Sequence, residues 1–127
     1  MNKHLIVLDL DGTLLTKEQT ILPYTKNILM EAQAQGHYVM IATGRPFRAS
    51  FPYYQQLNLK TPIVNFNGAL VHNPLDTSWQ PLHSPVSISV VHDVIDSTKK
   101  IQYENVIAEV KDDVYFHKQN DELRDIF

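Results

Sequence analysis

The 127-residue sequence predicts an α/β fold with a parallel sheet at its core. Three short apolar runs each end in a polar or glycine-containing turn, which is typical of buried strands followed by loops. A stretch with helical spacing joins the first run to the second. Strand, helix and strand thus follow within about forty residues, as in a right-handed parallel crossover unit. The three runs are residues 5–10, 38–42 and 62–66.

The first run stops at two carboxylates, Asp9 and Asp11, which are followed by Gly12 and Thr13. The apolar residues before them predict a strand buried on both faces, and such a strand should not carry charge. In an extended chain, side chains two positions apart share a face, so both aspartates could point at one bound group. A divalent cation is the partner that satisfies two such carboxylates at the lowest cost.

Two helical stretches separate the three runs. Pro23 suits the first turn of a helix, and Gly36 suits its end. In the second stretch, Pro52 conflicts with an uninterrupted helix from Phe47. We therefore predict a helix that restarts with Ser50 as its cap, so that Pro52 falls in its first turn.

After the third run, the pattern of alternating buried strands and helices ends, and the expected elements are a hairpin, a helix and two further strands. The hairpin is expected at 69–83, the helix from Ser84, the strands at 105–110 and 114–118, and the start of another helix at 119–127. We assign residues 1–83 to the N-terminal part of a core domain and residues 84–127 to the start of a second domain.

Composition excludes several classes of partner. The chain is 43 % hydrophobic and 20 % charged, with a formal net charge of −3, so neither nucleic acid nor an anionic membrane is expected to bind it. There is no cysteine, which excludes disulfides and favours a reducing, cytoplasmic location. The N-terminal apolar run is too short for a signal peptide or a membrane span.

If the three strands lie parallel, their turns meet at one edge of the sheet, which is where α/β folds bind ligands. The first turn carries Asp9 and Asp11. The functional interpretation makes Asp9 a nucleophile toward phosphorus and Asp11 the general acid and base, with Mg²⁺ bridging Asp9 and the phosphoryl group. The alternative is an acidic surface turn without function, which the buried run and the Gly-Thr pair make the weaker reading.

The other two turns supply candidate phosphate and substrate contacts. Thr43 and Gly44 offer a hydroxyl and a backbone N–H at the end of the second strand, although an ordinary turn also favours these residues. Arg45 could bind a substrate anion, pair with a neighbouring carboxylate or be a solvated surface residue. Asn67 and Gly68 could position the substrate or form a simple turn. The six histidines show no metal-ligand spacing.

These motifs resemble those of the haloacid dehalogenase-like hydrolase superfamily. The segment from Asp9 to Thr13 is similar to its first motif. Residues 42–46, Ala-Thr-Gly-Arg-Pro, and the Asn-Gly-Ala that begins at Asn67 resemble the Cof-type sugar-phosphate phosphatase branch. The order and spacing agree over roughly the first eighty residues, and residues 84–127 resemble the start of that branch's α/β cap only loosely.

The resemblance implies a Rossmann-like core, Mg²⁺ dependence and hydrolysis of small phosphomonoesters through an aspartyl-phosphate. It implies that Asp9 is the nucleophile, that Asp11 is the acid and base, and that the Asp9 carboxylate and the Asp11 carbonyl contact Mg²⁺. Phosphate contacts would come from the Leu10 backbone, Thr43 and Gly44. The family's third and fourth motifs, with a basic residue and paired acidic residues, have no match in the sequence.

Three strands are also fewer than a doubly wound sheet usually has. We therefore expect a truncated form of a phosphatase with impaired activity, or a chain that associates with itself through its incomplete sheet. Two other functions stay open: a phosphohexomutase-like phosphotransferase that shares both aspartates, and a non-catalytic remnant of the fold.

Overall fold

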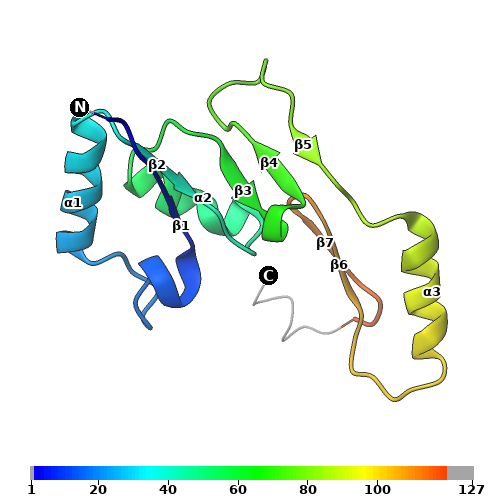
Figure 1. Ribbon diagram of the computed structural model, residues 1–127. Coiled ribbons are helices and arrows are strands. Elements are labelled where there is room, and N and C mark those ends of the chain that lie inside the picture. Colours follow the sequence, from blue (N-terminus) through cyan, green and yellow to red (C-terminus); the bar gives the residue numbers. More distant parts are fainter. Residues whose placement is uncertain (1, 120–127) are drawn as a thin grey trace. The chain divides into compact units, whose positions relative to one another are not determined.

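The computed structural model describes residues 2–119 (Figure 1). The chain divides into two compact units, Met1–Ser84 and Pro85–Phe127, which we call the N-terminal and C-terminal units. The expected start of a helix at 119–127 lies outside the described residues, apart from residue 119 itself.

The N-terminal unit contains the predicted parallel strands. Strand β1 (Leu5–Leu8) pairs in parallel with β2 (Tyr38–Ile41), and β3 (Ile63–Asn65) continues the order through a parallel bridge between Ala42 and Val64. Figure 1 shows the three strands side by side. The expected α/β fold class with a parallel sheet is confirmed.

Two helices form the crossovers between these strands. Helix α1 (Pro23–Ala34) begins at the predicted proline, and Gly36 follows its end with φ +89°. Helix α2 (Phe47–Gln56) connects β2 to β3. Burial of apolar side chains from all these elements makes the core. The fully buried members are Leu10, Val39, Ile41, Tyr54, Leu57, Leu59 and Ile63.

The predicted restart of α2 at Ser50 is wrong. The helix begins at Phe47 after Pro46, and Pro52 lies inside it. Ser50 is completely buried, and its hydroxyl is within hydrogen-bonding distance of the Pro46 and Phe47 carbonyls, at 3.2 and 3.1 Å. A hydroxyl bonded back to the preceding turn is compatible with a helix interior, so Ser50 does not act as a cap.

The predicted hairpin at 69–83 is confirmed, with shorter strands. Strand β4 (Leu70–His72) pairs antiparallel with β5 (Leu82–His83). The structure adds a pairing that the sequence did not predict, because β4 also runs antiparallel to β3, with Ile63 opposite His72. The turn after β3 therefore reverses the chain at the edge of the sheet where the expected site lies.

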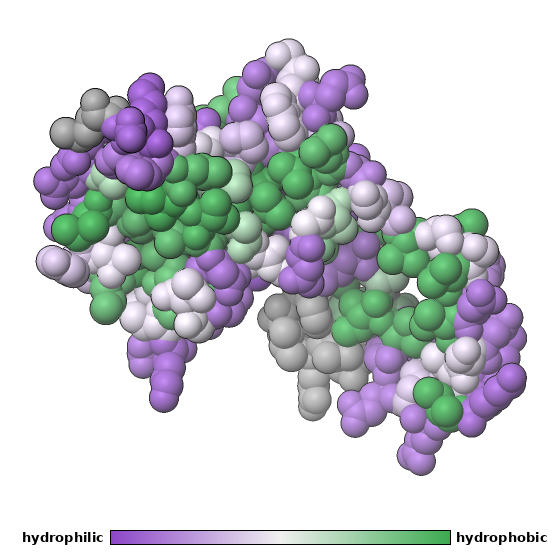
Figure 2. All heavy atoms as spheres, viewed as in Figure 1, coloured by the Kyte–Doolittle hydropathy of each residue, from purple (hydrophilic) through white to green (hydrophobic). Residues whose placement is uncertain are grey.

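The prediction that β1 is buried on both faces is wrong. Its side chains alternate between exposed and half-buried, and Leu5 and Val7 are 58 % and 48 % exposed. Hydrophobic side chains accordingly gather on the surface over β1 and β2 (Figure 2). Among the described residues, β1 pairs with β2 on one side only, so its other edge has no covering strand.

This apolar strand has no proline and no charge within Leu5–Leu8 that would block edge pairing. Self-association through the edge therefore stays a prediction. Light scattering on the purified chain should give a mass above the 14.6 kDa of one copy. A mass of one copy at micromolar concentration would contradict it.

The C-terminal unit contains α3 (Ile88–Thr98) and a hairpin of β6 (Ile107–Val110) and β7 (Asp113–Phe116). The helix starts later than the expected Ser84, because Ser87 caps it by accepting a hydrogen bond from the Val90 N–H.

Within residues 2–119, no helix combines the length and apolar character needed to cross a bilayer.

Candidate functional site

The loop after β1 places the two aspartates. Asp9 keeps extended backbone angles, and the chain then turns tightly from Leu10 to Leu14. Backbone N–H groups of Leu14 and Leu15 donate to the carbonyls of Asp9 and Leu10, at 3.2 and 2.9 Å. The Leu10 side chain is 0 % exposed. Leu14 and Leu15 are buried in the same core, so leucines at both ends anchor the loop that carries both carboxylates.

The expectation that Asp9 and Asp11 share a strand face is wrong. Leu10 already belongs to the turn, and Gly12 has a φ of +70°, so the two-residue alternation of a strand ends at Asp9. Asp9 lines a pocket at the end of β1, whereas Asp11 does not line it and instead pairs with Arg45.

The pocket lies where the three parallel strands end. Its volume is about 400 Å³. It brings together Asp9 from the first turn, Thr43 and Gly44 from the second, and Asn67 and Gly68 from the third. Ala42 and Val64, the bridged pair of β2 and β3, complete its lining. The predicted convergence of the three turns is therefore present.

The second and third turns are joined by backbone hydrogen bonds. The Asn67 N–H donates to the Thr43 carbonyl at 3.2 Å, and the Phe66 N–H donates to the Arg45 carbonyl at 3.4 Å. The Thr43 hydroxyl accepts from the Arg45 N–H at 3.2 Å, and Thr43 is only 4 % exposed. The two turns thus form one connected rim of the pocket.

The turn after β3 has an uncommon backbone. Phe66, Asn67 and Gly68 all have positive φ, at 51°, 54° and 98°. Positive φ is costly for a bulky residue such as Phe66, and such conformations persist only where the surroundings enforce them. This is the part of the pocket where the Asn-Gly pair was predicted to position a substrate.

Arg45 pairs with a carboxylate, which was one of its three expected roles. Its Nε and Nη2 donate to the two Asp11 carboxylate oxygens at 2.7 and 2.5 Å. Nη2 also donates to the Gln19 side-chain carbonyl, and the guanidinium lies 5.6 Å from the centre of the Tyr53 ring. The Arg45 hydrogen bonds hold the pKa of Asp11 below its ordinary value, although burial acts in the opposite direction.

We expect Arg45→Gln to raise the pKa of Asp11 toward that of an ordinary aspartate. Folding lowers the pKa of Asp11, so the Arg45–Asp11 pair stabilises the fold fully at pH values above the ordinary aspartate pKa of about 3.9. This stabilisation is lost as the pH falls through the pKa of Asp11 in the folded state. The Asp11 side chain is 52 % exposed. Solvent screening therefore limits the loss at neutral pH to about 1 kcal/mol or less. NMR titration of the Asp11 carboxyl measures the shift.

The exposed ion pair of Lys99 and Asp96 on the C-terminal unit offers a control. Lys99→Gln should leave the titration of Asp11 unchanged. An Asp11 pKa that does not rise in Arg45→Gln would show that the pairing does not persist in solution.

Gly44 lies against the side chain of Asn67, which leaves no room for a Cβ unless that side chain moves. A Cβ on residue 44 would lie 2.9 Å from the Asn67 Oδ1, which is closer than real Cβ contacts allow. We expect Gly44→Ala to push the Asn67 carboxamide out of place and to weaken binding of orthovanadate, a phosphate analogue, about tenfold. The double variant Gly44→Ala/Asn67→Ala lacks the colliding atom, so it should bind no worse than Asn67→Ala alone. Additive losses would contradict this contact.

The sequence interpretation missed one buried polar residue behind the pocket. Asn65, the last residue of β3, is 0 % exposed. Its Nδ2 donates to the Arg45 carbonyl and to the Ser50 hydroxyl, both at 2.9 Å. A polar residue within the apolar run 62–66 was the available signal, because buried amides are almost always hydrogen-bonded.

The described residues do not form an all-protein metal cage. Within 2–119, no three histidine, cysteine or acidic side chains cluster as metal ligands. Mg²⁺ nevertheless fits a site with few protein ligands, because it usually binds through one or two carboxylates together with water and substrate phosphate. The exposed Asp9 carboxylate in the pocket is a donor of this kind.

Comparisons with known proteins identify relatives of this chain. A model of the haloacid dehalogenase-like hydrolase family matches residues 6–126. The 5-amino-6-(5-phospho-D-ribitylamino)uracil phosphatase YitU of Bacillus subtilis is 50 % identical over 98 % of this chain and 46 % of its own length. The pyridoxal phosphate phosphatase YbhA of Escherichia coli is 42 % identical over 58 % of this chain and 27 % of its own.

A solved structure agrees with these sequence matches. The crystal structure of TM0651 from Thermotoga maritima superposes with a TM-score of 0.75 at 26 % identity, over 99 % of this chain and 46 % of that one. The chain thus spans about half the length of YitU and of this structural relative.

Proposed function

Since the chain belongs to the haloacid dehalogenase-like hydrolase family, we propose that it carries the nucleophile and phosphate-binding turns of a Mg²⁺-dependent phosphatase. The observation that carries the proposal is the pocket in which Asp9 faces the Thr43–Gly44 and Asn67–Gly68 turns. A carboxylate beside backbone and hydroxyl donors, at the carboxyl ends of parallel strands, suits attack on a bound phosphoryl group.

In this proposal Asp9 attacks phosphorus, and the bond from phosphorus to the leaving oxygen breaks. A water molecule then hydrolyses the resulting aspartyl-phosphate. The Thr43 hydroxyl and the Gly44 N–H hold phosphoryl oxygens, and the Leu10 backbone adds a further contact. Asn67 and Gly68 line one side of the pocket, and in this proposal they orient the rest of the substrate.

We assign the proton transfers to Asp11, which gives a proton to the leaving oxygen and takes one from water. Its pairing with Arg45 favours the charged carboxylate and so opposes proton donation. Arg45 therefore has to release Asp11 during the reaction, and a substrate anion near Arg45 would favour that release.

The Asp9 carboxylate and the Asp11 carbonyl are the groups proposed to hold Mg²⁺. When bound there, the ion would reduce the repulsion between the Asp9 carboxylate and an anionic substrate. The remaining protein ligands of the family's fourth motif have no counterpart in this sequence. We therefore propose that the 127 residues alone react more slowly than relatives of twice their length.

The proposed substrates are small phosphorylated metabolites, such as sugar phosphates. YitU is named for a phosphorylated ribitylamino-uracil and shares half of its aligned residues with this chain, so that compound is the first to test. The C-terminal unit is proposed as the start of the cap that selects the substrate. The absence of cysteine supports a cytoplasmic location.

The test is phosphate release from this compound and from p-nitrophenyl phosphate, with Mg²⁺ or with EDTA. Mg²⁺-dependent release supports the phosphatase. Transfer of the phosphoryl group to an added sugar phosphate without net release would instead indicate the phosphotransferase. If neither reaction occurs and orthovanadate does not bind in the presence of Mg²⁺, the result indicates a non-catalytic remnant of the fold.

A further inference from the structure

We propose that Asn65 is a positioning residue that fixes the backbone of the phosphate-binding turns. The inference rests on the proposed function, because it assigns the residue that keeps those turns in place. Asn65 itself does not line the pocket and acts through the backbone of Arg45.

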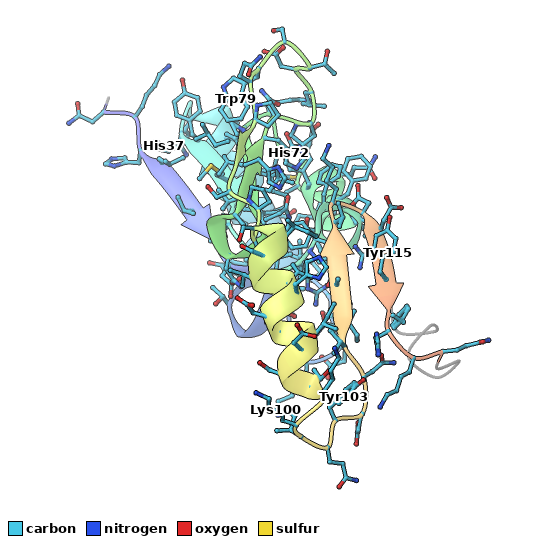
Figure 3. The ribbon with its side chains drawn as sticks, turned by 90° about the vertical axis from the view of Figure 1, so that its right-hand side faces the viewer. His37, His72, Trp79, Lys100, Tyr103 and Tyr115 are labelled. Atoms are coloured by element: carbon cyan, nitrogen blue, oxygen red, sulfur yellow. The ribbon has the colours of Figure 1, made fainter. Side chains whose placement is uncertain are left out.

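The hydrogen bonds determine how the Asn65 carboxamide is oriented. The Arg45 carbonyl can only accept, so the amide nitrogen of Asn65 must face it at 2.9 Å. The side-chain oxygen of Asn65 then faces the Nε2 of His72 at 3.2 Å, and His72 must carry a proton there. His72 lies on β4 and is labelled in Figure 3.

The second amide hydrogen of Asn65 goes to Ser50. The Ser50 hydroxyl accepts it and in turn donates toward the Pro46 or Phe47 carbonyl in the first turn of α2. The carboxamide thus satisfies both donors and its oxygen. It connects β4, the end of β3, the Thr43–Arg45 turn and the start of α2 through one buried group.

The hydrogen bond from Asn65 to the Arg45 carbonyl lies next to the turn with positive φ at Phe66, Asn67 and Gly68. The Arg45 carbonyl that Asn65 binds also accepts the N–H of Phe66, the first residue of the left-handed turn. A strained turn keeps its conformation only if its surroundings enforce it. The buried amide of Asn65 supplies that constraint from behind, so the pocket rim is already formed before a phosphoryl group binds.

An aspartate at position 65 is the sharpest change, because it keeps the shape and removes the donors. Its carboxylate oxygens would face the Arg45 carbonyl in a buried place, which is strongly unfavourable. Asn65→Ser, which is smaller and uncharged, serves if the aspartate variant does not fold. Ser50→Ala removes only the helix partner and leaves the bond to Arg45.

Tyr54→Phe is the matched control. It removes another hydrogen bond of the same unit, from the hydroxyl of the buried Tyr54 to the Thr61 carbonyl at 2.7 Å, which does not involve the pocket turns. It should lower the stability of the whole unit without a specific effect on the turns.

Two measurements separate positioning from general stability. Amide hydrogen exchange follows the N–H groups of Phe66 and Asn67, with the Leu59 N–H, bonded to the Tyr54 carbonyl, as the core reference. Binding of orthovanadate in the presence of Mg²⁺ follows the pocket. For Asn65→Asp or Asn65→Ser we expect about tenfold faster exchange at Phe66 and Asn67 relative to Leu59, and about tenfold weaker binding.

Tyr54→Phe should keep both the relative exchange and the affinity close to the wild type. Ser50→Ala keeps the bond from Asn65 to Arg45 but removes the acceptor of the second amide hydrogen, so it should lose less than the Asn65 variants. Unchanged relative exchange at Phe66 and Asn67 in a folded Asn65 variant would overturn the proposal, as would an equal loss in Tyr54→Phe. If the wild-type chain binds no orthovanadate, the proposed phosphatase function fails. The exchange result then still decides whether Asn65 positions the turns.

Discussion

Replacing Asp9 by asparagine is expected to abolish Mg²⁺-dependent phosphate release, with a loss of roughly a thousandfold or more. The change keeps the shape of the side chain but removes the charge and most of its nucleophilicity. Asp9 is exposed, so the fold should not suffer. Release from p-nitrophenyl phosphate is the measurement, with hydrogen exchange as the check on folding.

Asp93→Asn is the matched control for this prediction. Asp93 is an exposed carboxylate on α3 in the C-terminal unit, so its replacement removes the same charge from a residue that does not line the pocket. Its activity should equal that of the wild type. Wild-type activity in Asp9→Asn would show that another group attacks phosphorus.

A large loss of stability is expected from Leu10→Ala. Leu10 is 0 % exposed and belongs to the core, although it stands between two exposed aspartates. Truncation of a buried leucine costs about 2–5 kcal/mol through lost transfer energy and the cavity that remains. Urea unfolding followed by the fluorescence of Trp79, the single tryptophan, reports on the N-terminal unit.

Leu75→Ala removes the same atoms from a side chain that is 56 % exposed. Its unfolding free energy should stay within about 0.5 kcal/mol of the wild type. If Leu10→Ala were equally mild, Leu10 would not anchor the loop after β1, and the placement of Asp9 would have to depend on Leu14 and Leu15.

Much of the fold followed from local patterns. The apolar runs, Pro23 and Gly36 located β1, α1 and β2, because a helix start and stop are encoded within a few residues. The convergence of Asp9, Thr43 and Asn67 on one pocket also followed, since parallel strands place their ends at one edge.

Other features depend on contacts between distant residues and could not be read in this way. An apolar run does not reveal whether other elements cover both faces of a strand, so the exposure of Leu5 and Val7 on one face was missed. The pairing of Arg45 with Asp11 depends on the tight turn that brings Asp11 beside it, and the sequence does not show that turn. Asn65 finds its partners on β4, the β2–α2 turn and α2, which are separated from it by 7, 20 and 15 residues in the sequence.

The most direct measurement of the central claim is ¹⁹F NMR of the chain with beryllofluoride, which mimics a phosphoryl group on an aspartate. The account predicts protein-bound ¹⁹F signals with Mg²⁺, and their loss with EDTA or in Asp9→Asn. Absence of bound signals in the wild type, or the same signals in Asp9→Asn, would contradict the assignment of Asp9 as the phosphoryl acceptor.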